Sequence, residues 1–268
     1  MIAPLTALDG ALRLWFVLTA LSVAIVATDV VRTAAIATVM KWGWVLVVAY
    51  TGPVGLVIYL LSCREPLPGQ HAAYVAPLWK QAVGSTIHCV AGDATGIITG
   101  ALVGVAFAMA PRVDAAFEYG AGFAFGLLIF QALFMRRAMG GSYATAVRRT
   151  VLPEWLSMNA LMAGMFPVMG ILMTHVPAAA DPRGLRFWGV MSSAILVGAF
   201  TAFPVNVWLV SNGLKHGMGT AQVLGHGGSD AMHADRRRPG AVAIGVVAAL
   251  TLIALAIGLA ISMRWGNL

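Results

Sequence analysis

Charged side chains are scarce in this chain: Asp, Glu, Lys and Arg make up 10% of its 268 residues, and hydrophobic residues make up 60%. A soluble globular domain has about 25% charged and about 45–50% apolar residues. The chain therefore has too little polar side chain to cover a water-exposed surface. Cysteine is also scarce, with two residues, which excludes a disulfide scaffold and a four-cysteine zinc module. The net charge of +7 does not indicate a nucleic-acid partner, because the basic residues stand in short stretches between apolar runs.

Long apolar runs dominate the sequence instead. A bilayer core about 30 Å thick requires about 20 apolar residues per crossing, and backbone hydrogen bonding in lipid makes each such run a helix. We therefore predict an all-α polytopic transmembrane helix bundle, formed as a single integral membrane domain over residues 1–268. The seven predicted spans are approximately Ala11–Ala27, Gly43–Leu61, Val83–Ala110, Ala116–Met135, Trp155–Val176, Phe187–Val210 and Ala241–Met263.

Lysine and arginine in the loops predict the orientation, because the side richer in them faces the cytoplasm. With seven crossings, this rule places the N-terminus in the cytoplasm and the C-terminus outside. The first helix is expected to be retained rather than cleaved, because no small-x-small cleavage site stands out before Asp29. The polar stretch 211–240 is predicted to be a cytoplasmic loop. The predicted cytoplasmic set is Arg13, Arg64, Lys80, Arg136, Arg137, Arg148, Arg149, Lys215, Arg236, Arg237 and Arg238.

Small residues recur every fourth position in the third predicted helix. Such spacing lets two helix backbones approach closely in lipid. It predicts tight packing, including the possibility of a homo-oligomer through glycine-rich faces, and indicates no chemistry by itself. The series is Gly84, His88, Gly92, Gly96, Gly100 and Gly104.

Asp93 lies in the middle of the same helix, where an ionisable side chain is costly unless it faces a partner or water. It is a candidate for proton or charge coupling, and the alternative is a structural hydrogen-bonded carboxyl. Cys89 is one turn before it on the same face, whereas His88 points about 140° away. Glu118, at the start of the fourth predicted helix, is either a second coupling group or an interfacial acid favoured by the helix dipole.

Methionines form a stripe on the fifth predicted helix, within an arc of about 80°. Thioethers prefer Cu(I), so the stripe fits a path for a soft metal ion. The alternative is ordinary core packing, because methionine is a flexible gap-filler. The stripe is Met158, Met162, Met165, Met169 and Met173, and the candidate metal ligands are its first four members with His88 and Cys89.

Histidine and methionine also occur in the polar stretch before the last helix. Such tracts indicate metal binding, though weakly. The candidates are His216, Met218, His226, Met232 and His233.

Three segments, HCVAGDATGIITG, EWLSMNALMAGMFPVM and FPVNVWLVSNGLKHGM, together resemble an uncharacterised family of bacterial polytopic membrane proteins, over about residues 51–218. The family is known as a domain of unknown function and is sometimes associated with multicopper oxidases. This resemblance implies a bacterial inner (plasma) membrane protein and favours copper, but it supplies no site residues.

These observations lead to three functional hypotheses. The first is a membrane transporter or metal-handling protein for a soft transition metal, Cu(I) above all, with copper as its cargo and a copper-handling protein as a partner. The second is a proton-coupled carrier of a small solute that uses Asp93 and Glu118, and the third is a non-transporting membrane scaffold. An enzyme is not expected, because the chain has no serine–histidine–acid set, no HExxH and no phosphate loop.

Overall fold

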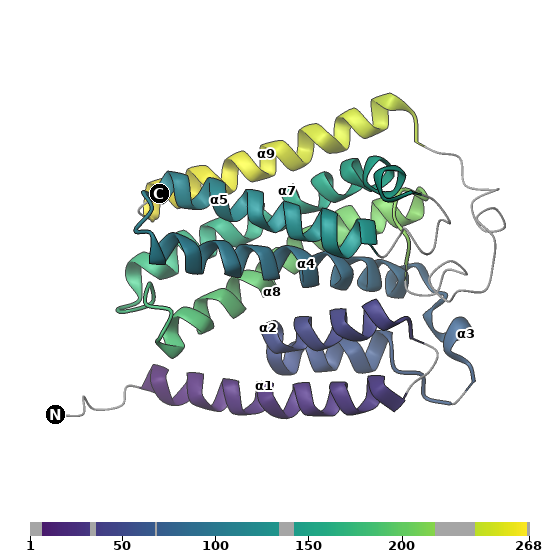
Figure 1. The fold of residues 1–268 in the computed structure, drawn as a ribbon, viewed down its shortest axis with the longest axis horizontal. Helices are drawn as coiled ribbons and strands as arrows, with labels where there is room; N and C mark the ends of the chain where they lie inside the picture. The colour runs from purple at the N-terminus through teal and green to yellow at the C-terminus, as the bar shows by residue number, and fades with distance from the viewer. Residues whose placement is uncertain (1–6, 33–35, 68, 134–141, 218–238, 267–268) are drawn as a thin grey trace.

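The computed structural model describes residues 7–32, 36–67, 69–133, 142–217 and 239–266, and these residues contain helices but no strand. The long elements lie roughly parallel as a bundle (Figure 1). By residue count and composition they include seven candidate membrane spans, which confirms the predicted all-α membrane fold. The elements are α1 (Ala7–Arg32), α2 (Thr38–Ser62), α3 (His71–Val75), α4 (Leu78–Ala106), α5 (Pro111–Ala124), the π-helix η1 (Phe125–Leu133), α7 (Tyr143–His175), α8 (Leu185–Ser211) and α9 (Ala241–Trp265).

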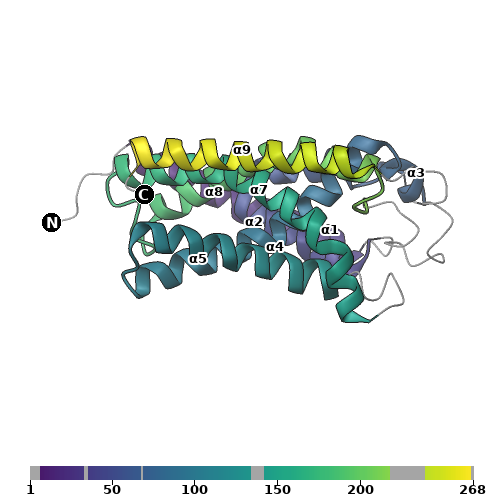
Figure 2. The ribbon, with the colours of Figure 1, turned by 90° about the horizontal axis from the view of Figure 1, so that it is seen from above.

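Burial places α4 and α7 at the centre of the bundle, because they have the largest buried share of the seven apolar segments. Helix α9 lies along the outside, as the two views of the ribbon show (Figures 1 and 2). It docks on α7 where Gly258 packs against the Ala163 carbonyl. Pro167 leaves that carbonyl without its helical partner, so α9 covers the exposed backbone.

The second apolar segment, α2, folds back on itself rather than running straight. Gly52 has φ 58° and ψ −137°, which is not helical and favours glycine. The rings of Trp44 and Tyr59 are 5.1 Å apart, whereas a continuous helix would separate these residues by about 22 Å. A Cβ on Gly55 would lie 3.2 Å from Val48 Cα. The segment is therefore a hairpin of two antiparallel helical arms, visible as stacked short helices in Figure 1.

The hairpin enters the bundle from one end and returns to it. Its arms, residues 38–51 and 53–62, are about 21 Å and 15 Å long, too short to cross a 30 Å core. The Gly52 turn lies against Trp15 and Thr19 in the middle of α1. At the same depth, the Tyr50 hydroxyl hydrogen-bonds the Thr95 hydroxyl of α4 at 2.7 Å. Re-entrant backbone at this depth is tolerated because protein surrounds it.

Because the hairpin does not cross, both ends of the described chain lie at the same end of the bundle. Asp9 in α1 is paired with Arg186 at the start of α8 (Oδ1–Nε 2.9 Å). His175 at the end of α7 lies 2.9 Å from the Trp265 carbonyl oxygen at the end of α9. We call this the terminal end. This arrangement differs from the expectation of seven crossings, which places the two chain ends on opposite sides, and the orientation itself stays a prediction.

Among the described residues, seven of the twelve Lys and Arg residues lie at the opposite end, and we call it the basic end. The fold moves Arg32 and Lys41 to this end and Arg13 to the terminal end, so the charge asymmetry is larger than a seven-span topology gives. The residues that belong to it by helix position are Arg32, Lys41, Arg64, Lys80, Arg148, Arg149 and Lys215. The predicted cytoplasmic residues Arg136, Arg137, Arg236, Arg237 and Arg238 lie outside the described residues.

The glycine series of α4 packs against α5 and η1, as its spacing predicts. A Cβ on Gly96 would overlap the backbone of Ala121, and a Cβ on Gly92 would lie 2.8 Å from Gly126 Cα. The two backbones are thus in direct contact, and this face of α4 is covered within the chain itself.

We predict that both chain ends face the same compartment, and that this is the non-cytoplasmic side, because the basic end should face the cytoplasm. Reporter fusions before Met1 and after Leu268 test this with one alkaline phosphatase and fluorescent-protein pair. A fusion within 218–238 serves as the cytoplasmic control. Opposite locations for the two terminal fusions would show that α2 crosses the membrane.

We predict that Gly96→Leu greatly lowers the yield and thermal stability of the purified protein, because the side chain would force α4 and α5 apart. Thr99→Leu, on the exposed face of the same helix, is the matched control and should behave like the wild type. Equal behaviour of both variants in size-exclusion and thermal-denaturation assays would refute the close-packing argument.

Candidate functional site

A buried ion pair lies at the centre of the candidate site. Lys215 Nζ is 3.0 Å from Glu154 Oε2, and both side chains are almost fully buried, with 4% and 0% of their surfaces exposed. Burial lowers the pKa of Lys215, but Cys89 and Glu154 more than offset this effect and raise its pKa above the usual value. The ammonium therefore stays charged at physiological pH, opposite a carboxylate that it neutralises.

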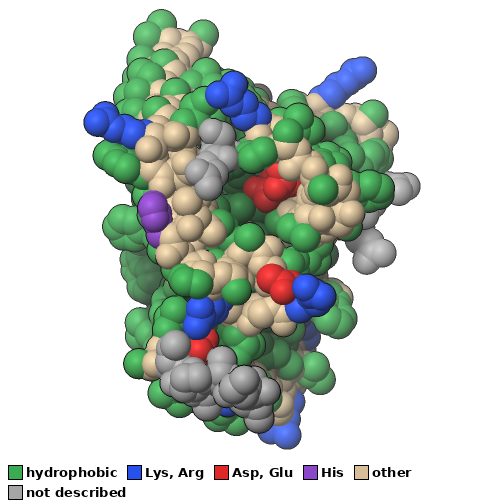
Figure 3. Space-filling model, turned by 90° about the vertical axis from the view of Figure 1, so that its left-hand side faces the viewer, with side chains coloured by type: hydrophobic (Ala, Val, Ile, Leu, Met, Phe, Trp, Pro, Cys, Tyr) green, Lys and Arg blue, Asp and Glu red, His purple; other side chains and the backbone are tan. Residues whose placement is uncertain are grey.

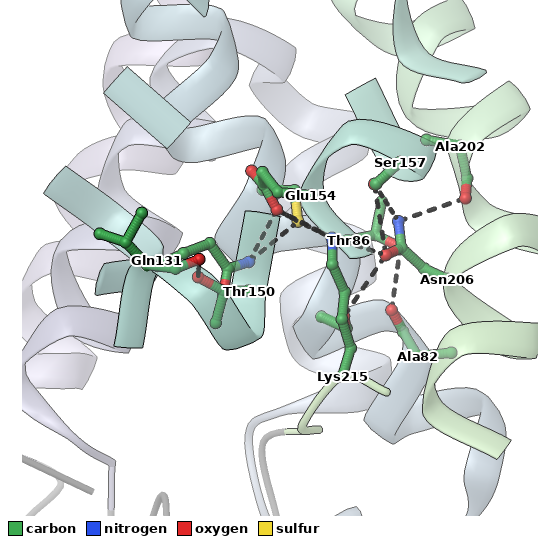
Figure 4. A network of polar contacts seen from close by, with 12 residues as sticks. Ala82, Thr86, Gln131, Thr150, Glu154, Ser157, Ala202, Asn206 and Lys215 are labelled. Atoms are coloured by element: carbon green, nitrogen blue, oxygen red, sulfur yellow. Dashed lines mark hydrogen bonds and ion pairs between the residues drawn. The ribbon is translucent and has the colours of Figure 1, made fainter. Parts of the chain in front are cut away.

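Cys89 and Gln131 complete the shell around this pair. Lys215 Nζ donates to Cys89 Sγ at 2.7 Å, and the Cys89 thiol donates to Glu154 Oε2 at 3.3 Å. Gln131 Nε2 donates to the same Glu154 oxygen at 2.9 Å. Cys89 belongs to α4, Gln131 to η1 and Glu154 to α7, so Glu154 Oε2 joins three elements (Figure 4).

Asn206 of α8 extends the network toward α7. Its Oδ1 accepts from Lys215 Nζ at 3.3 Å, and its Nδ2 donates to Ser157 Oγ at 3.0 Å. Ser85 Oγ of α4 also donates to Asn206 Oδ1, at 3.4 Å. We refer to Ser85, Cys89, Gln131, Glu154, Ser157, Asn206 and Lys215 as the ion-pair network.

A glycine turn delivers Lys215 into the bundle. Gly213 has φ 68°, and the Leu214 N–H donates to the Leu209 carbonyl across it at 2.9 Å. This is the common way in which a glycine ends a helix and reverses the chain. Lys215 follows two residues later and so points back between α4 and α7 rather than into solvent.

A π-helix delivers Gln131. The nine residues of η1 continue α5 with a wider turn, a geometry that is rare and frequent at functional sites. Within it, Gly126 leaves a small space that two carboxyl groups fill: a Cβ there would overlap Asp93 Oδ1 and lie 2.6 Å from Glu154 Oε1.

Asp93 is fully buried about half-way along α4, beside Glu154. Among the described residues, no donor hydrogen-bonds to either oxygen of Asp93 or to Glu154 Oε1. Two acceptors that face one small space without a donor are costly when buried. A single proton held between the two carboxyl groups would provide the missing donor. Asp93 as a coupling group stays a prediction, and the structure places Glu154 beside it.

The other metal-ligand candidates of α4 divide between this network and packing. Cys89 belongs to the ion-pair network, whereas His88 packs edge-on against Phe130 of η1, with ring centroids 5.9 Å apart. Among the described residues, no group of three or more His, Cys, Asp and Glu side chains could hold a metal ion. His88 and Cys89 therefore remain ligand predictions that need thioethers or other donors.

The methionine stripe lies mainly in the hydrophobic core. Met158, Met162 and Met165 have no exposed surface, and Met169 has 7%. Met158 Cε packs at Gly122 of α5, and Met165 Cγ packs at Gly198 of α8. These contacts are those of gap-filling side chains between helices, and the stripe as a metal path stays a prediction.

The loop candidates lie mostly beyond the described part of the chain. Met218, His226, Met232 and His233 are outside it. His216 is described and is half-buried directly after Lys215. The loop as a metal-binding segment therefore stays a prediction.

Glu118 lies away from the network, in a pocket of about 370 Å³ at the terminal end of the bundle. The pocket is bounded by the end of α4, the start of α5, the end of α7 and the start of α8. Acidic side chains are visible in a hollow at this end (Figure 3). Between pocket and network, the Tyr119 hydroxyl donates to Asn159 Oδ1 at 2.6 Å.

Sequence reasoning missed the roles of Gln131, Ser157 and Lys215. Lys215 was expected in a loop, and the signal for its burial was the glycine two residues earlier. Glu154 was the clearer signal, as an acid directly before the apolar span that is expected to begin at Trp155. Nothing in the local sequence around Gln131 distinguishes it from a lipid-facing residue.

The comparison with known families decides the relationship of this chain. Residues 78–215, just over half of the chain, match the family described as domain of unknown function DUF4396. The chain belongs to the DUF4396 family. The DUF4396 segment begins at α4 and ends at Lys215, so the whole ion-pair network lies within it, whereas α1, the α2 hairpin and α9 lie outside. No curated protein and no solved structure matches the chain.

We predict that Lys215→Met destabilises the protein by about 3–5 kcal/mol, because it leaves Glu154 buried without its cation. The double variant Glu154→Gln/Lys215→Met should recover most of this loss, since both charges are then absent. Arg183→Met, in an exposed ion pair with Asp181, is the control and should leave thermal denaturation unchanged. If the double variant is no more stable than Lys215→Met, the pair is not the source of the effect.

Proposed function

We propose that this protein is a proton-coupled membrane carrier of a small solute, in which Asp93 and Glu154 hold the transported proton. The observation that carries the proposal is that the buried carboxyl groups of Asp93 and Glu154 lie together beside one ammonium group, that of Lys215. Within the described residues, both Asp93 oxygens and Glu154 Oε1 have no hydrogen-bond donor. Buried ionisable groups inside a membrane protein mark ion pathways and proton relays more than structural sites.

Charge balance favours one exchangeable proton at this site. Lys215 neutralises one of the two carboxylates through its contact with Glu154. A second negative charge at Asp93 would have no cation beside it among the described residues, and two adjacent carboxylates repel each other. The site is therefore expected to alternate between a state with a shared proton and a state in which a cation or an opening to water compensates the second charge.

Polar groups connect this site to the terminal end. The Tyr119–Asn159 pair lies between α5 and α7, one turn beyond the carboxyl groups. Further along α5, Glu118 and Asp114 line the pocket. A proton or solute that enters there meets polar side chains at successive depths, whereas neighbouring faces of the same helices are apolar.

Interrupted helices next to the carboxyl groups support movement rather than a static anchor. The Gly52 turn of the hairpin lies at mid-depth and is tied to α4 through Tyr50 and Thr95, two residues after Asp93. The π-helix η1 lies on the other side of the same site. Transporters place their binding sites where discontinuous helices meet near the bilayer midplane.

A soft-metal carrier for Cu(I) is the second candidate. The observation in its favour is that Met109, Met169 and Met173 line the same pocket as Glu118. Thioethers next to carboxylates suit a soft cation. The core packing of Met158, Met162 and Met165 speaks against a continuous metal path.

We predict that infrared spectroscopy of the wild type in liposomes detects a protonated carboxylic acid that titrates with pH, and that Asp93→Asn removes this band. The physical reason is that asparagine keeps the shape of the side chain and removes its ionisable group. Asp181→Asn, which changes an exposed acid paired with Arg183, is the matched control and should retain the band.

The same variants test coupling. Liposomes with a trapped pH indicator and an imposed proton gradient are exposed to a panel of small cations, anions and neutral solutes. At least one solute should collapse the gradient through the wild type and Asp181→Asn but not through Asp93→Asn. A solute that moves protons equally well through Asp93→Asn would remove Asp93 from the mechanism, and a band that persists in Asp93→Asn would remove the shared proton.

A further inference from the structure

The pocket at the terminal end combines negative charge with apolar walls. The acids that line it are Asp114 and Glu118, and none of its lining residues is Lys, Arg or His. Its aromatic walls are Phe166 and Phe187, which belong to α7 and α8. Such a pocket attracts positive charge and repels strongly hydrated ions, since its apolar walls offer them few ligands.

Glu118 is the decisive side chain because it is buried without a partner. It is 5% exposed, and no hydrogen bond or ion pair to another described residue satisfies its carboxyl group. Asp114 Oδ1, held against Gly104 of α4, is also buried without a hydrogen-bond donor in the described part of the chain. A buried carboxyl group is either protonated or balanced by a counter-charge, and a cation bound in the pocket would supply that counter-charge.

The size and walls of the pocket distinguish between kinds of cation. Its volume of about 370 Å³ falls in the range typical of small organic ligands, about 300–1,000 Å³, and far exceeds a bare metal ion. Aromatic faces attract organic ammonium groups through cation–π interactions. Met169 and Met173 add polarisable, flexible surface that adapts to the shape of an organic ligand.

We propose that this pocket is the binding site for a monovalent organic ammonium ion, whose charge is placed at Glu118 and whose apolar part lies against Phe166 and Phe187. As the substrate class of the carrier, this inference rests on the proposed function. Binding at the terminal end would place the cation at one mouth of the polar series that leads to Asp93. Entry of a cation and release of the shared proton then keep the total charge inside the bundle constant.

The experiment uses the purified full-length protein in lipid nanodiscs and isothermal titration calorimetry. The probe is benzyltrimethylammonium, and the matched ligand is neopentylbenzene, which has the same shape with carbon in place of the charged nitrogen. We expect the ammonium probe to bind at least about tenfold more tightly than the neutral compound, a difference of about 1.4 kcal/mol.

Variants assign the binding to the pocket. Glu118→Gln should weaken binding of the ammonium probe about tenfold or more, and Asp114→Asn should weaken it less. The control is Asp181→Asn. Asp181 follows the pocket residue Ala180 in the chain, and Arg183 already neutralises its charge, so this variant should bind like the wild type. Equal binding of the two ligands by the wild type, a test that needs no variant, would overturn the proposal, and so would unchanged binding by Glu118→Gln.

Silver ion, as a soft metal probe, separates the two chemistries. If Ag⁺ binds, Met169→Leu and Met173→Leu abolish that binding, and the ammonium probe does not bind, the pocket is a soft-metal site and the proposal fails. Asp93→Asn should bind the ammonium probe normally.

Flux measurements separate the ammonium site from the carrier mechanism. If the probe binds but moves no protons in liposomes, the carrier mechanism fails and the ammonium site stands. If another solute drives coupled proton flux while the probe does not bind, the ammonium site fails and the carrier mechanism stands.

Discussion

The Lys215 ammonium is almost fully buried inside the bundle, away from water, and its stability there depends on groups from α4, α7 and α8. Glu154 supplies the opposite charge, Cys89 a sulfur acceptor, and Asn206 an amide oxygen. Displacing any of these helices would leave a buried charge without a partner, at a cost of several kcal/mol. The central helices are thus held in one arrangement by a requirement that apolar packing alone could not impose, because lipid tails solvate apolar faces equally well.

The same requirement creates the functional asymmetry of the interior. One cation faces two carboxyl groups, so Glu154 is neutralised. Asp93, whose carboxyl group faces the same small space at Gly126, is left without a cation among the described residues. A purely structural site would be expected to balance its charges. A site one proton short of balance is suited to exchange. The fold places it between a re-entrant hairpin that is interrupted at Gly52 and a π-helix, so regular α-helical hydrogen bonding is broken on both sides.

The arrangement also separates recognition from coupling. The acidic pocket lies at the terminal end, and the shared-proton site lies near mid-depth, with Tyr119 and Asn159 between them. The DUF4396 segment contains both the pocket and the ion-pair network, whereas the hairpin and α9 add contacts around it. Helices outside the segment therefore support the site from its periphery, through Thr95 of α4 and through the Ala163 carbonyl of α7.

The sequence determined what lipid demands of every segment: seven apolar helices, a basic end, and close packing along the Gly92–Gly96 face. These features follow from local composition and residue spacing, which can be determined directly from the sequence. The reversal at Gly52 was visible as a break but not as a hairpin, because a glycine–proline pair permits a kink or a full turn and α1 and α4 decide between them. The partners of Asp93 and Lys215 were decided by tertiary structure alone, because Glu154 and Lys215 are 61 positions apart in the chain and become neighbours only once α7 and α8 pack together.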